Sequence, residues 1–347
     1  MITHAITAGL RANLSATGWK PLLGVALSVA IGAAAAVGPH AARAAESAQA
    51  YPSKPIRIVV GFTPGGVADI AARVVAIRLA ENWKQQVVVD NRPGAGSAIG
   101  TGIAAAAEPN GYTMISVSAA HAILPALYSK LPFDSERDFS GVAVTCTGPL
   151  LLIASSSAGV KSVKELIALA KAKPGHLNFA SAGVGSATHF AMEVFKSKAG
   201  INLVHVPYKG VPEALTDTLT GRVQLFISPL INAMPQVKGG KVVALGVTTT
   251  FRSDLLPDVP TISESGLPGY RAESWHALLV PAKTPRAIVA RLHAEIARIL
   301  QQPDAREQFA KLGLVSPPTT PEALDQYIRG EIATYKDIAR AAGIKAE

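Results

Sequence analysis

The sequence has little of what disulfide, thiol or aromatic chemistry would need. Its 347 residues contain one cysteine, Cys146, so no internal disulfide can form. That cysteine lies in the apolar stretch VTCTGPLLLI, which predicts a buried core position. Aromatic residues make up 5%, charged residues 16% and hydrophobic residues 49%, a balance that is typical of a globular chain and excludes a disordered one.

The sequence also lacks the marks of metal, nucleic-acid or dinucleotide binding. Its eight histidines are scattered, with no pair at ligand spacing on one predicted element, so we expect no metal site. The formal charge of +9 is not gathered into a run of lysine and arginine, so we expect no nucleic-acid partner. The stretch GAGSAIG (94–100) resembles a dinucleotide-binding turn, but the next strand, TMISVS, carries no acidic residue for a ribose. We therefore expect no cofactor.

Residues 1–44 are predicted to be a secretory signal peptide. Arg11 and Lys20 give a basic start, residues 22–37 form an uncharged apolar run, and residues 42–44 read Ala-Arg-Ala, an A-x-A cleavage pattern. The alternative is an uncleaved anchor, but the run of about 16 residues is shorter than the ~20 that a spanning helix needs. The sequence therefore predicts a mature protein that is free in the periplasm.

The mature chain alternates short β-branched runs with helical patterns, and its length suggests two domains. This alternation predicts α/β layers around mostly parallel sheets. Strands are expected at residues 56–62, 87–90, 113–117, 150–154, 177–180, 203–206, 223–227 and 242–247. Beyond about residue 283 only helices are expected, one of them with an apolar face of Leu324, Ile328, Ile332 and Tyr335.

One glycine-rich turn points to anion binding. In GFTPGGVADIAAR (61–73) a strand passes through Pro64, Gly65 and Gly66 into a helix that starts near Val67. Such a turn presents unpaired backbone N–H groups at the carboxyl end of a strand, where an anion is bound without a positive side chain. Both glycines allow backbone angles closed to other residues, and without a side chain they allow close approach.

The same construction recurs along the chain. NRPGAGSAIG (91–100) and SAGVGSATH (181–189) each follow a predicted strand and enter a helix, and VPYKG (206–210) ends another strand. One such turn is weak support for a ligand site. The repetition favours several turns that line one site.

Together these stretches resemble the Bug-type periplasmic solute receptors of tripartite tricarboxylate transporters. The resemblance covers nearly the whole mature chain, in the order YPSKPIRIVVGFTPGGVADIAAR, VVVDNRPGAGSAIG, PNGYTM, SAGVGSATH, VPYKG, PDVPTISESGLPGY and SWHALLVPAKTP. It implies a two-lobed type II periplasmic binding protein, or Venus flytrap, in which each lobe is a mostly parallel sheet flanked by helices. Such a receptor closes on a small carboxylate and delivers it to membrane permease subunits, and we expect it to be a monomer.

The resemblance also implies how the chain is divided. Residues 51–149 and 265–347 would form the first lobe, and residues 150–264 the second. Hinges are expected near residues 147–150 and 248–265.

By resemblance, the ligand carboxylate is held largely by backbone amides, small hydroxyl groups and ordered waters. Many relatives carry a threonine where this chain has Ala68, so the exact ligand cannot be transferred. The predicted ligand-binding residues are Pro64, Gly65, Gly66 and Val67 on one wall, Ser181, Gly185, Ser186, Thr188 and His189 on the other, and Phe62, Asp69, Ser118, His121, Tyr208, Ser228 and Trp275 around them.

Several roles stay open at this point. Asp69 would repel a bound carboxylate, so capping and shaping of the loop is favoured over ligand contact. The aromatic residues Phe62, Tyr208 and Trp275 are either core residues or a platform for an aromatic acid, so aromatic and aliphatic cargo both remain open.

Two other functions compete with a transport receptor. Ser186 and His189, three residues apart, suggest a hydrolase pair, but no G-x-S-x-G elbow surrounds the serine and no nearby acidic residue is marked out to orient the histidine. We therefore expect no enzyme. A sensor subunit that binds the same acids and signals to a membrane partner is the other alternative.

Overall fold

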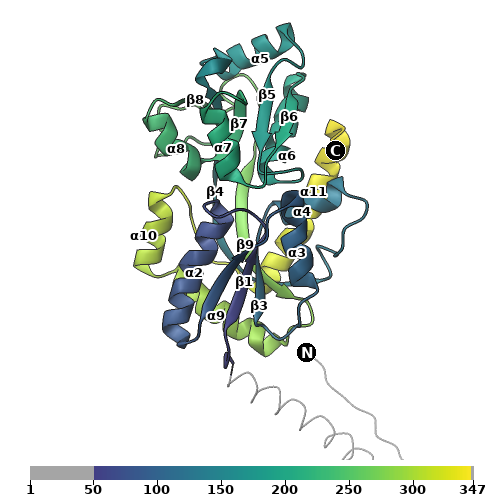
Figure 1. The fold of residues 1–347 in the computed structure, drawn as a ribbon, viewed down its shortest axis with the longest axis vertical. Coiled ribbons are helices and arrows are strands. Elements are labelled where there is room, and N and C mark those ends of the chain that lie inside the picture. Colours follow the sequence, from purple (N-terminus) through teal and green to yellow (C-terminus); the bar gives the residue numbers. More distant parts are fainter. Residues whose placement is uncertain (1–50, 345–347) are drawn as a thin grey trace, which may run out of the picture. The chain divides into compact units, whose positions relative to one another are not determined.

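A computed structural model describes residues 51–344, which build an α/β fold on a mixed sheet (Figure 1). The predicted signal peptide, residues 1–44, lies outside the described residues. The strands are β1 (Ile56–Val60), β2 (Val87–Asn91), β3 (Thr113–Ser118), β4 (Phe139–Ser155), β5 (Asn178–Ser181), β6 (Val204–Pro207), β7 (Leu225–Pro229), β8 (Val242–Val247) and β9 (Glu273–Pro281).

Helices connect and cover these strands. They are α2 (Val67–Trp83), α3 (Ala98–Ala105), α4 (Ala120–Leu127), α5 (Val163–Ala172), α6 (Ala187–Ala199), α7 (Val211–Leu219), α8 (Leu230–Lys238), α9 (Arg286–Leu300), α10 (Pro303–Lys311) and α11 (Pro321–Ala342), with short 3-10 turns at Ala95–Ser97 and Ser156–Ala158. In the half of the sheet that holds β1 and β3, α2 and α9 lie on one face and α3, α4 and α11 on the other (Figure 1).

The sheet is parallel in its outer parts and antiparallel in the middle. Its strand order is β2-β1-β3-β9-β4-β7-β5-β6, with β8 paired to β4. The pairs β1–β2, β1–β3, β5–β6 and β5–β7 are parallel, whereas β9 and β4 run antiparallel to their neighbours. The two parallel parts are the sheets of the two lobes, joined by the central strands.

Strand β4 runs through both lobes. Its first part pairs with β9 as far as Pro149, opposite Glu273, and its second part pairs with β7 from Leu150, opposite Pro229. The chain returns through residues 248–272, between β8 and β9. The two segments in which the chain passes from one lobe to the other therefore lie near the centre of the sheet.

The sequence prediction located eight of the strands in part or whole, but it missed two features. The first half of β4 and all of β9 were not expected. Both segments are buried on both faces, so they lack the alternation of polar and apolar residues that marks a half-buried strand.

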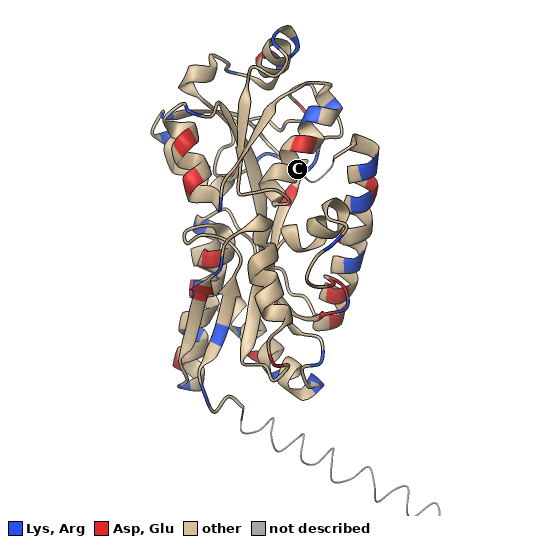
Figure 2. Cartoon of the chain, turned by 45° about the vertical axis from the view of Figure 1, so that its right-hand side comes forward, with Lys and Arg blue, Asp and Glu red and all other residues tan. Residues whose placement is uncertain are grey.

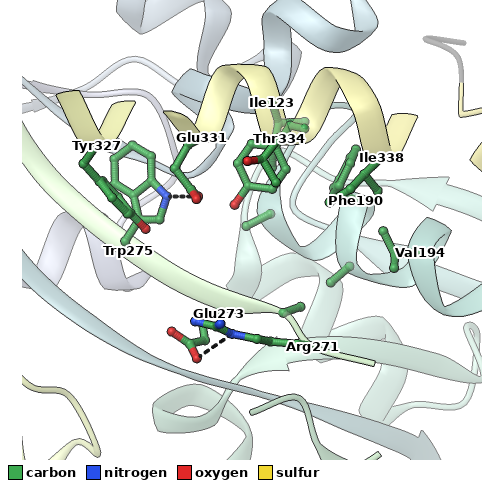
Figure 3. Close-up of a pocket in the computed structure, with 14 residues that line it drawn as sticks. Ile123, Phe190, Val194, Arg271, Glu273, Trp275, Tyr327, Glu331, Thr334 and Ile338 are labelled. Atoms are coloured by element: carbon green, nitrogen blue, oxygen red, sulfur yellow. Dashed lines mark hydrogen bonds and ion pairs between the residues drawn. The ribbon is translucent and has the colours of Figure 1, made fainter. Parts of the chain in front are cut away.

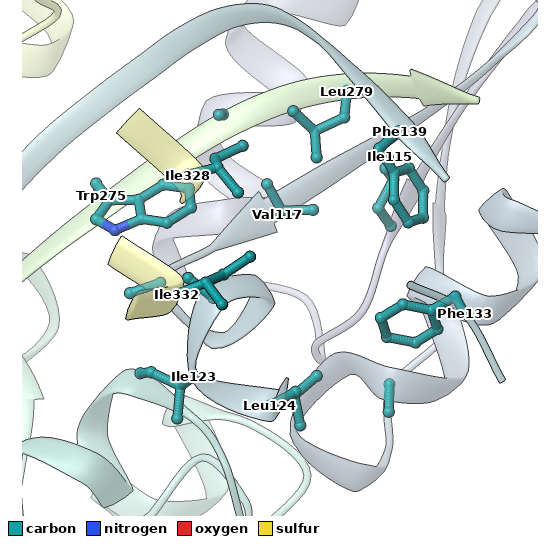
Figure 4. Close-up of a cluster of buried hydrophobic side chains, with 14 of the residues drawn as sticks. Ile115, Val117, Ile123, Leu124, Phe133, Phe139, Trp275, Leu279, Ile328 and Ile332 are labelled. Atoms are coloured by element: carbon teal, nitrogen blue, oxygen red, sulfur yellow. The ribbon is translucent and has the colours of Figure 1, made fainter. Parts of the chain in front are cut away.

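The apolar core of the first lobe is closed by α11. Leu324, Ile328 and Ile332 are buried against β3, α4 and β9, as the helical spacing predicted, and Trp275 lies in the same cluster (Figure 4). Thr320 caps the helix, since its hydroxyl oxygen accepts the Ala323 N–H at 3.2 Å. A second cluster fills the other lobe around β5, β7 and α6.

The charged residues are distributed over the helices rather than gathered by sign. Figure 2 shows acidic and basic residues interspersed along the helices, including α11. In this view the basic positions of the described residues are separated by acidic and uncharged ones.

We predict that Ile332→Ala lowers the free energy of unfolding by about 2–5 kcal/mol, because a buried side chain is replaced by a cavity. Lys336→Ala, on the exposed side of the same helix, should change it by less than about 0.5 kcal/mol. Denaturant titration of both variants measures the difference. Equal effects would show that α11 does not close this core.

Candidate functional site

Three helices, α2, α6 and α7, begin at one small cavity, and the first residue of α7, Val211, lines it. Val67 and Ala68 are the first residues of α2, Ala187 and Thr188 are the first residues of α6, and all four line the same cavity. The first N–H groups of a helix have no acceptor within the helix and carry a partial positive charge. The cavity is therefore positively polarised by the helices that begin at it.

The cavity lies where the two halves of the sheet meet. Across the strand pairs, Ser118 lies opposite His276 and Leu150 opposite Pro229, so these residues form its floor. The volume is about 40 Å³, more than the ~10–15 Å³ that a single water needs. The remaining lining residues are Phe62, Ala182, Ser186 and Ser274.

No lysine, arginine, aspartate or glutamate is among the described residues that line the cavity. A negative ligand would have to be stabilised by hydrogen-bond donors and helix dipoles. Glycine-rich turns followed by helices are suited to this, as the sequence predicted.

Hydroxyl groups beside the helix starts are held in place by the backbone. The Ser186 oxygen accepts the His189 N–H at 3.2 Å and lies 3.0 Å from the Thr188 oxygen, which accepts the Ala182 N–H at 2.9 Å. On the floor, the Ser118 oxygen accepts the Ala120 N–H at 3.3 Å. The positions of these hydroxyl groups are thus fixed before a ligand arrives.

The Asp69 side chain holds in place the turn before α2, residues 63–66, which is here called the first turn. Its carboxylate accepts hydrogen bonds from the Gly65 N–H at 3.0 Å, the Arg73 side chain at 3.0 Å and the Asn91 amide at 3.0 Å. Burial acts to raise the pKa of Asp69, but these hydrogen bonds together hold it below its usual value. Its side chain is 3% exposed and does not line the cavity.

The two glycines of the first turn differ. Gly65 has φ of +88°, which favours glycine, whereas Gly66 has φ of −79° and adopts an ordinary extended conformation at the helix N-cap. The backbone freedom of glycine is therefore used at Gly65 but not at Gly66.

The structure brings only some of the predicted site residues to the cavity. Phe62, Val67, Ser118, Ser186 and Thr188 line it. Pro64, Gly65, Gly66, Ser181 and Gly185 belong to the adjoining turns without lining it, and the remaining candidates are engaged elsewhere.

His189 does not line the cavity. It holds in place the turn before α6, residues 181–186, which is here called the second turn. Its Nδ1 atom accepts the Gly185 N–H at 3.3 Å, and its ring stacks on that of His205 with centroids 4.2 Å apart. Burial and the neighbouring His205 and Lys196 lower the pKa of His189 to about 3, so the ring is neutral. Ser186 receives the backbone N–H of His189, not its ring, which is not the arrangement of a serine nucleophile with its base.

Three more candidates are bonded to other groups. The Tyr208 hydroxyl donates to Asp217 at 2.7 Å, which with burial raises the pKa of the tyrosine to about 12. The Ser228 hydroxyl donates to the carbonyl of the next residue at 3.2 Å, and the Ser181 oxygen lies 2.6 Å from the Nε2 atom of His205. These contacts brace strand ends.

His121 is a core residue. Its Nε2 atom donates to the Ser135 carbonyl at 2.8 Å, and its ring packs between Phe133 and Phe139. Burial lowers its pKa to about 4.

Trp275 faces away from the cavity because side chains alternate along β9. Its indole N–H donates to Glu331 at 3.0 Å beside Tyr327, in a separate cavity of about 330 Å³ against α11 (Figure 3). That larger space is lined mostly by apolar side chains, and the guanidinium of Arg271 in it is paired with Glu273 (Figure 3). Ala187, at the start of α6, lines both cavities, whereas Val67 and Ala68, at the start of α2, line the smaller one.

The residues that the sequence analysis missed are Ser274 and His276, which flank Trp275 and face the cavity. Because β9 was not predicted, the alternation of its side chains could not be used to tell which residues lie on which face of the strand. With that strand in place, residues two apart share one side.

Another glycine-rich turn, at residues 94–97, contacts the second lobe. Ala95, Gly96 and Ser97 have φ of +46°, +59° and +86°. A Cβ atom on Gly96 would lie 2.0 Å from the Val184 carbonyl oxygen of the second lobe, so only glycine allows this approach. The turn therefore packs closely against Val184.

Two hydrogen bonds, here called the rim bonds, join the lobes beside the cavity. The Thr63 hydroxyl donates to Glu213 at 2.9 Å, and the Asn232 amide donates to the Gly65 carbonyl at 3.0 Å. Both rim bonds involve the first turn, so they hold that turn in position against the second lobe.

The sequence matches the family described as "Tripartite tricarboxylate transporter family receptor" over residues 71–344. The chain belongs to that family of solute-binding receptors. BugT of Bordetella pertussis is 35% identical over 301 residues, covering 86% of this chain and 92% of that protein. The predicted Bug-type membership is confirmed.

Solved structures of receptors agree with the fold. An R. palustris protein solved with adipate is 34% identical, with a TM-score of 0.81 over 84% of this chain and 98% of that one. MatC of Rhodopseudomonas palustris, solved with bound malate, is 32% identical, with a TM-score of 0.80 over 83% of this chain and 99% of that one. The predicted two-lobed binding-protein fold is confirmed.

Within residues 51–344, no three histidine, cysteine, aspartate or glutamate side chains are grouped so that they could hold a metal ion. The same part of the chain has no helix that combines the length and apolarity needed to cross a bilayer.

The rim bond between Thr63 and Glu213 should stabilise the closed form. We predict that Thr63→Val and Glu213→Gln each weaken carboxylate affinity about 3- to 10-fold, mainly through a faster koff, since a hydrogen bond to a charged group contributes roughly 1.5–3 kcal/mol and exposure reduces this. The double variant should lose no more than the single variants.

Calorimetry with the tightest-binding member of a di- and tricarboxylate panel measures this cycle. Lys311→Ala, which breaks an exposed ion pair with Glu307 far from the cavity, is the control. Additive losses at positions 63 and 213 would show that the two side chains act independently.

Proposed function

We propose that the chain is the periplasmic receptor of a tripartite tricarboxylate-type transporter. It captures a small carboxylate by closing two lobes and delivers it to membrane permease subunits. The observation that supports this best is the meeting of two helix N-termini, at Val67 and Ala187, in one cavity without charged side chains.

Hydrogen bonds alone suffice for useful affinity. Each bond to a charged group contributes about 1.5–3 kcal/mol, so four to six bonds give very roughly 6–18 kcal/mol before costs. Micromolar binding needs about 8 kcal/mol. Backbone amides, with the one hydroxyl proton that Ser186 and Thr188 do not use between themselves, therefore provide enough donors without a salt bridge.

Closure couples binding to recognition by the transporter. We propose that residues 51–149 with 265–347 move as one lobe and residues 150–264 as the other, with hinges near residues 147–150 and 248–265. The ligand bridges both walls, so it stabilises the closed form by its contacts to the second wall. The permease would then distinguish loaded from empty receptor.

An aliphatic cargo is favoured over an aromatic one. Of the three aromatic candidates only Phe62 lines the cavity, because Trp275 packs against α11 and Tyr208 bonds Asp217. The related receptors solved with adipate and with malate point the same way.

A ligand screen tests the proposal. We expect the purified mature protein to be stabilised in a thermal-shift assay by one or more aliphatic carboxylates, with micromolar or tighter Kd, and to return the acid unchanged after incubation. Lack of binding across mono-, di- and tricarboxylates would contradict a carboxylate receptor, and conversion of the acid would indicate an enzyme.

Substitutions at Gly66 separate binding from folding. The side chain of an N-cap residue lies over the N–H groups of the first turn, so Gly66→Ser would occupy those donors itself and Gly66→Val would cover them. An added Cβ has no neighbour closer than 3.9 Å there, so both variants should fold. We predict at least about 10-fold weaker carboxylate binding for both, with equal or higher thermal stability for Gly66→Ser.

Gly330→Ser is the matched control, since Gly330 lies in α11 with open space around its Cβ position. It should bind as the wild type does. Unchanged affinity in a folded Gly66→Ser protein would rule out the α2 N-terminus as part of the site.

A further inference from the structure

The larger cavity beside α11, here called the α11 cavity, has aromatic walls. The rings of Phe190, Trp275, Tyr327 and Tyr335 line it, and they come from α6, β9 and α11 (Figure 3). Its volume of about 330 Å³ lies within the range of small-molecule pockets, about 300–1,000 Å³. The proposed function makes no use of this space, which is large enough for a small organic molecule.

The four rings form two nearly perpendicular pairs. The ring centroids of Trp275 and Tyr327 lie 5.5 Å apart with 74° between the planes, and those of Phe190 and Tyr335 lie 5.1 Å apart with 79°. The face of an aromatic ring is its negative part and attracts a cation. Rings set at right angles around one space can contact the same cation from different directions, as in the aromatic cages that bind quaternary ammonium groups.

A carboxylate lies among these rings. Tyr327, Glu331 and Tyr335 are each four residues apart on α11, so they share one face of the helix. The Glu331 carboxylate accepts the Trp275 indole N–H at 3.0 Å (Figure 3). Among the described residues no lysine, arginine or histidine forms an ion pair with Glu331. Its negative charge is therefore not compensated by a cation of the chain.

The other charged residues of the α11 cavity do not supply that cation. Arg271 is paired with Glu273 at 3.2 Å, and with Glu331 they are the three charged residues that line the space. The formal charge of the lining is therefore −1. Burial, followed by the charge of Glu331, raises the pKa of both Tyr327 and Tyr335, which agrees with a negative charge beside the two rings.

We propose that the α11 cavity is a second binding site, which takes an organic ammonium ion. The aromatic rings contact the methyl or methylene groups of the ion, and Glu331 compensates its charge. A quaternary ammonium head suits this lining, because it has no N–H group and needs ring faces and a nearby anion rather than hydrogen-bond acceptors. A carboxylate would be repelled by Glu331, so this site differs in ligand from the smaller cavity and does not rest on the proposed function.

The test compares an ammonium ion with its neutral counterpart. The probes are tetramethylammonium, choline and 3,3-dimethyl-1-butanol, in which a carbon atom replaces the nitrogen of choline. In calorimetry, the mature protein should bind choline at least about 10-fold more tightly than the alcohol, because only the cation is attracted by the rings and by Glu331. Tetramethylammonium should bind as well, and it should compete with choline. Equal affinity for choline and the alcohol, or no binding of either ammonium ion, overturns the proposal.

Two substitutions on α11 separate the charge from the rings. Glu331→Gln keeps the shape of the side chain and an acceptor for the Trp275 N–H, and it should reduce the preference for choline to about 3-fold or less. Tyr327→Leu removes a ring at a position that is 42% exposed, and it should weaken choline binding about 3- to 10-fold, whereas Tyr327→Phe keeps the ring and most of the affinity.

Asp337→Asn is the matched control, because it makes the same change of charge at an exposed position of α11 that does not line the cavity. It should bind choline as the wild type does. A preference that survives Glu331→Gln overturns the proposal, as does an equal loss in Asp337→Asn.

A measurement on the wild type covers the case in which Glu331→Gln does not fold. The trimethylammonium protons of bound choline should give intermolecular nuclear Overhauser effects to the indole ring of Trp275, assigned as the indole that remains in Trp83→Phe. Gly66→Ser, which is aimed at the carboxylate site, should leave this signal and the affinity for choline unchanged. Saturation with choline without a contact to the Trp275 ring overturns the proposal, whatever the outcome for carboxylates.

Discussion

The proposed function depends on one constraint, which is that a cavity whose described lining has no charged side chain must hold a negative ligand through backbone dipoles. Helices α2 and α6 come from different lobes, yet both begin at this cavity, and their first N–H groups have no acceptors within the helices. A fixed cation would neutralise the ligand more strongly, but a set of neutral donors imposes directions on it. Such donors act together only when the two lobes are close.

In the proposed function, closure of the lobes and recognition of the ligand are one event. The contact of Gly96 with the Val184 carbonyl and the bonds from Thr63 and Asn232 all cross between the lobes beside the cavity. They are made by the turns that carry the ligand donors or by their neighbours. The strands β4 and β9 run beneath the cavity, so the floor lies at the point about which the lobes would move.

The sequence predicted the turns that form the walls of the cavity better than the strands that form its floor. The turns before Val67 and Ala187 could be found because glycine, proline and capping residues are local signals, readable without knowledge of the fold. The floor comes from strands that pair across long sequence distances. Because β9 is buried on both faces, its apolar run carries no period, and Trp275 was chosen although its neighbour His276 is the one that lines the cavity. The partners of His121 and Tyr208 could not be read from the sequence either, since they come from other elements.

The most direct test of the account is a crystal structure with the carboxylate that binds most tightly. The account predicts that carboxylate oxygens lie about 2.7–3.2 Å from backbone nitrogens at the starts of both α2 and α6, with no lysine or arginine in contact. A carboxylate held by a basic side chain, or by only one of the two helices, would contradict it.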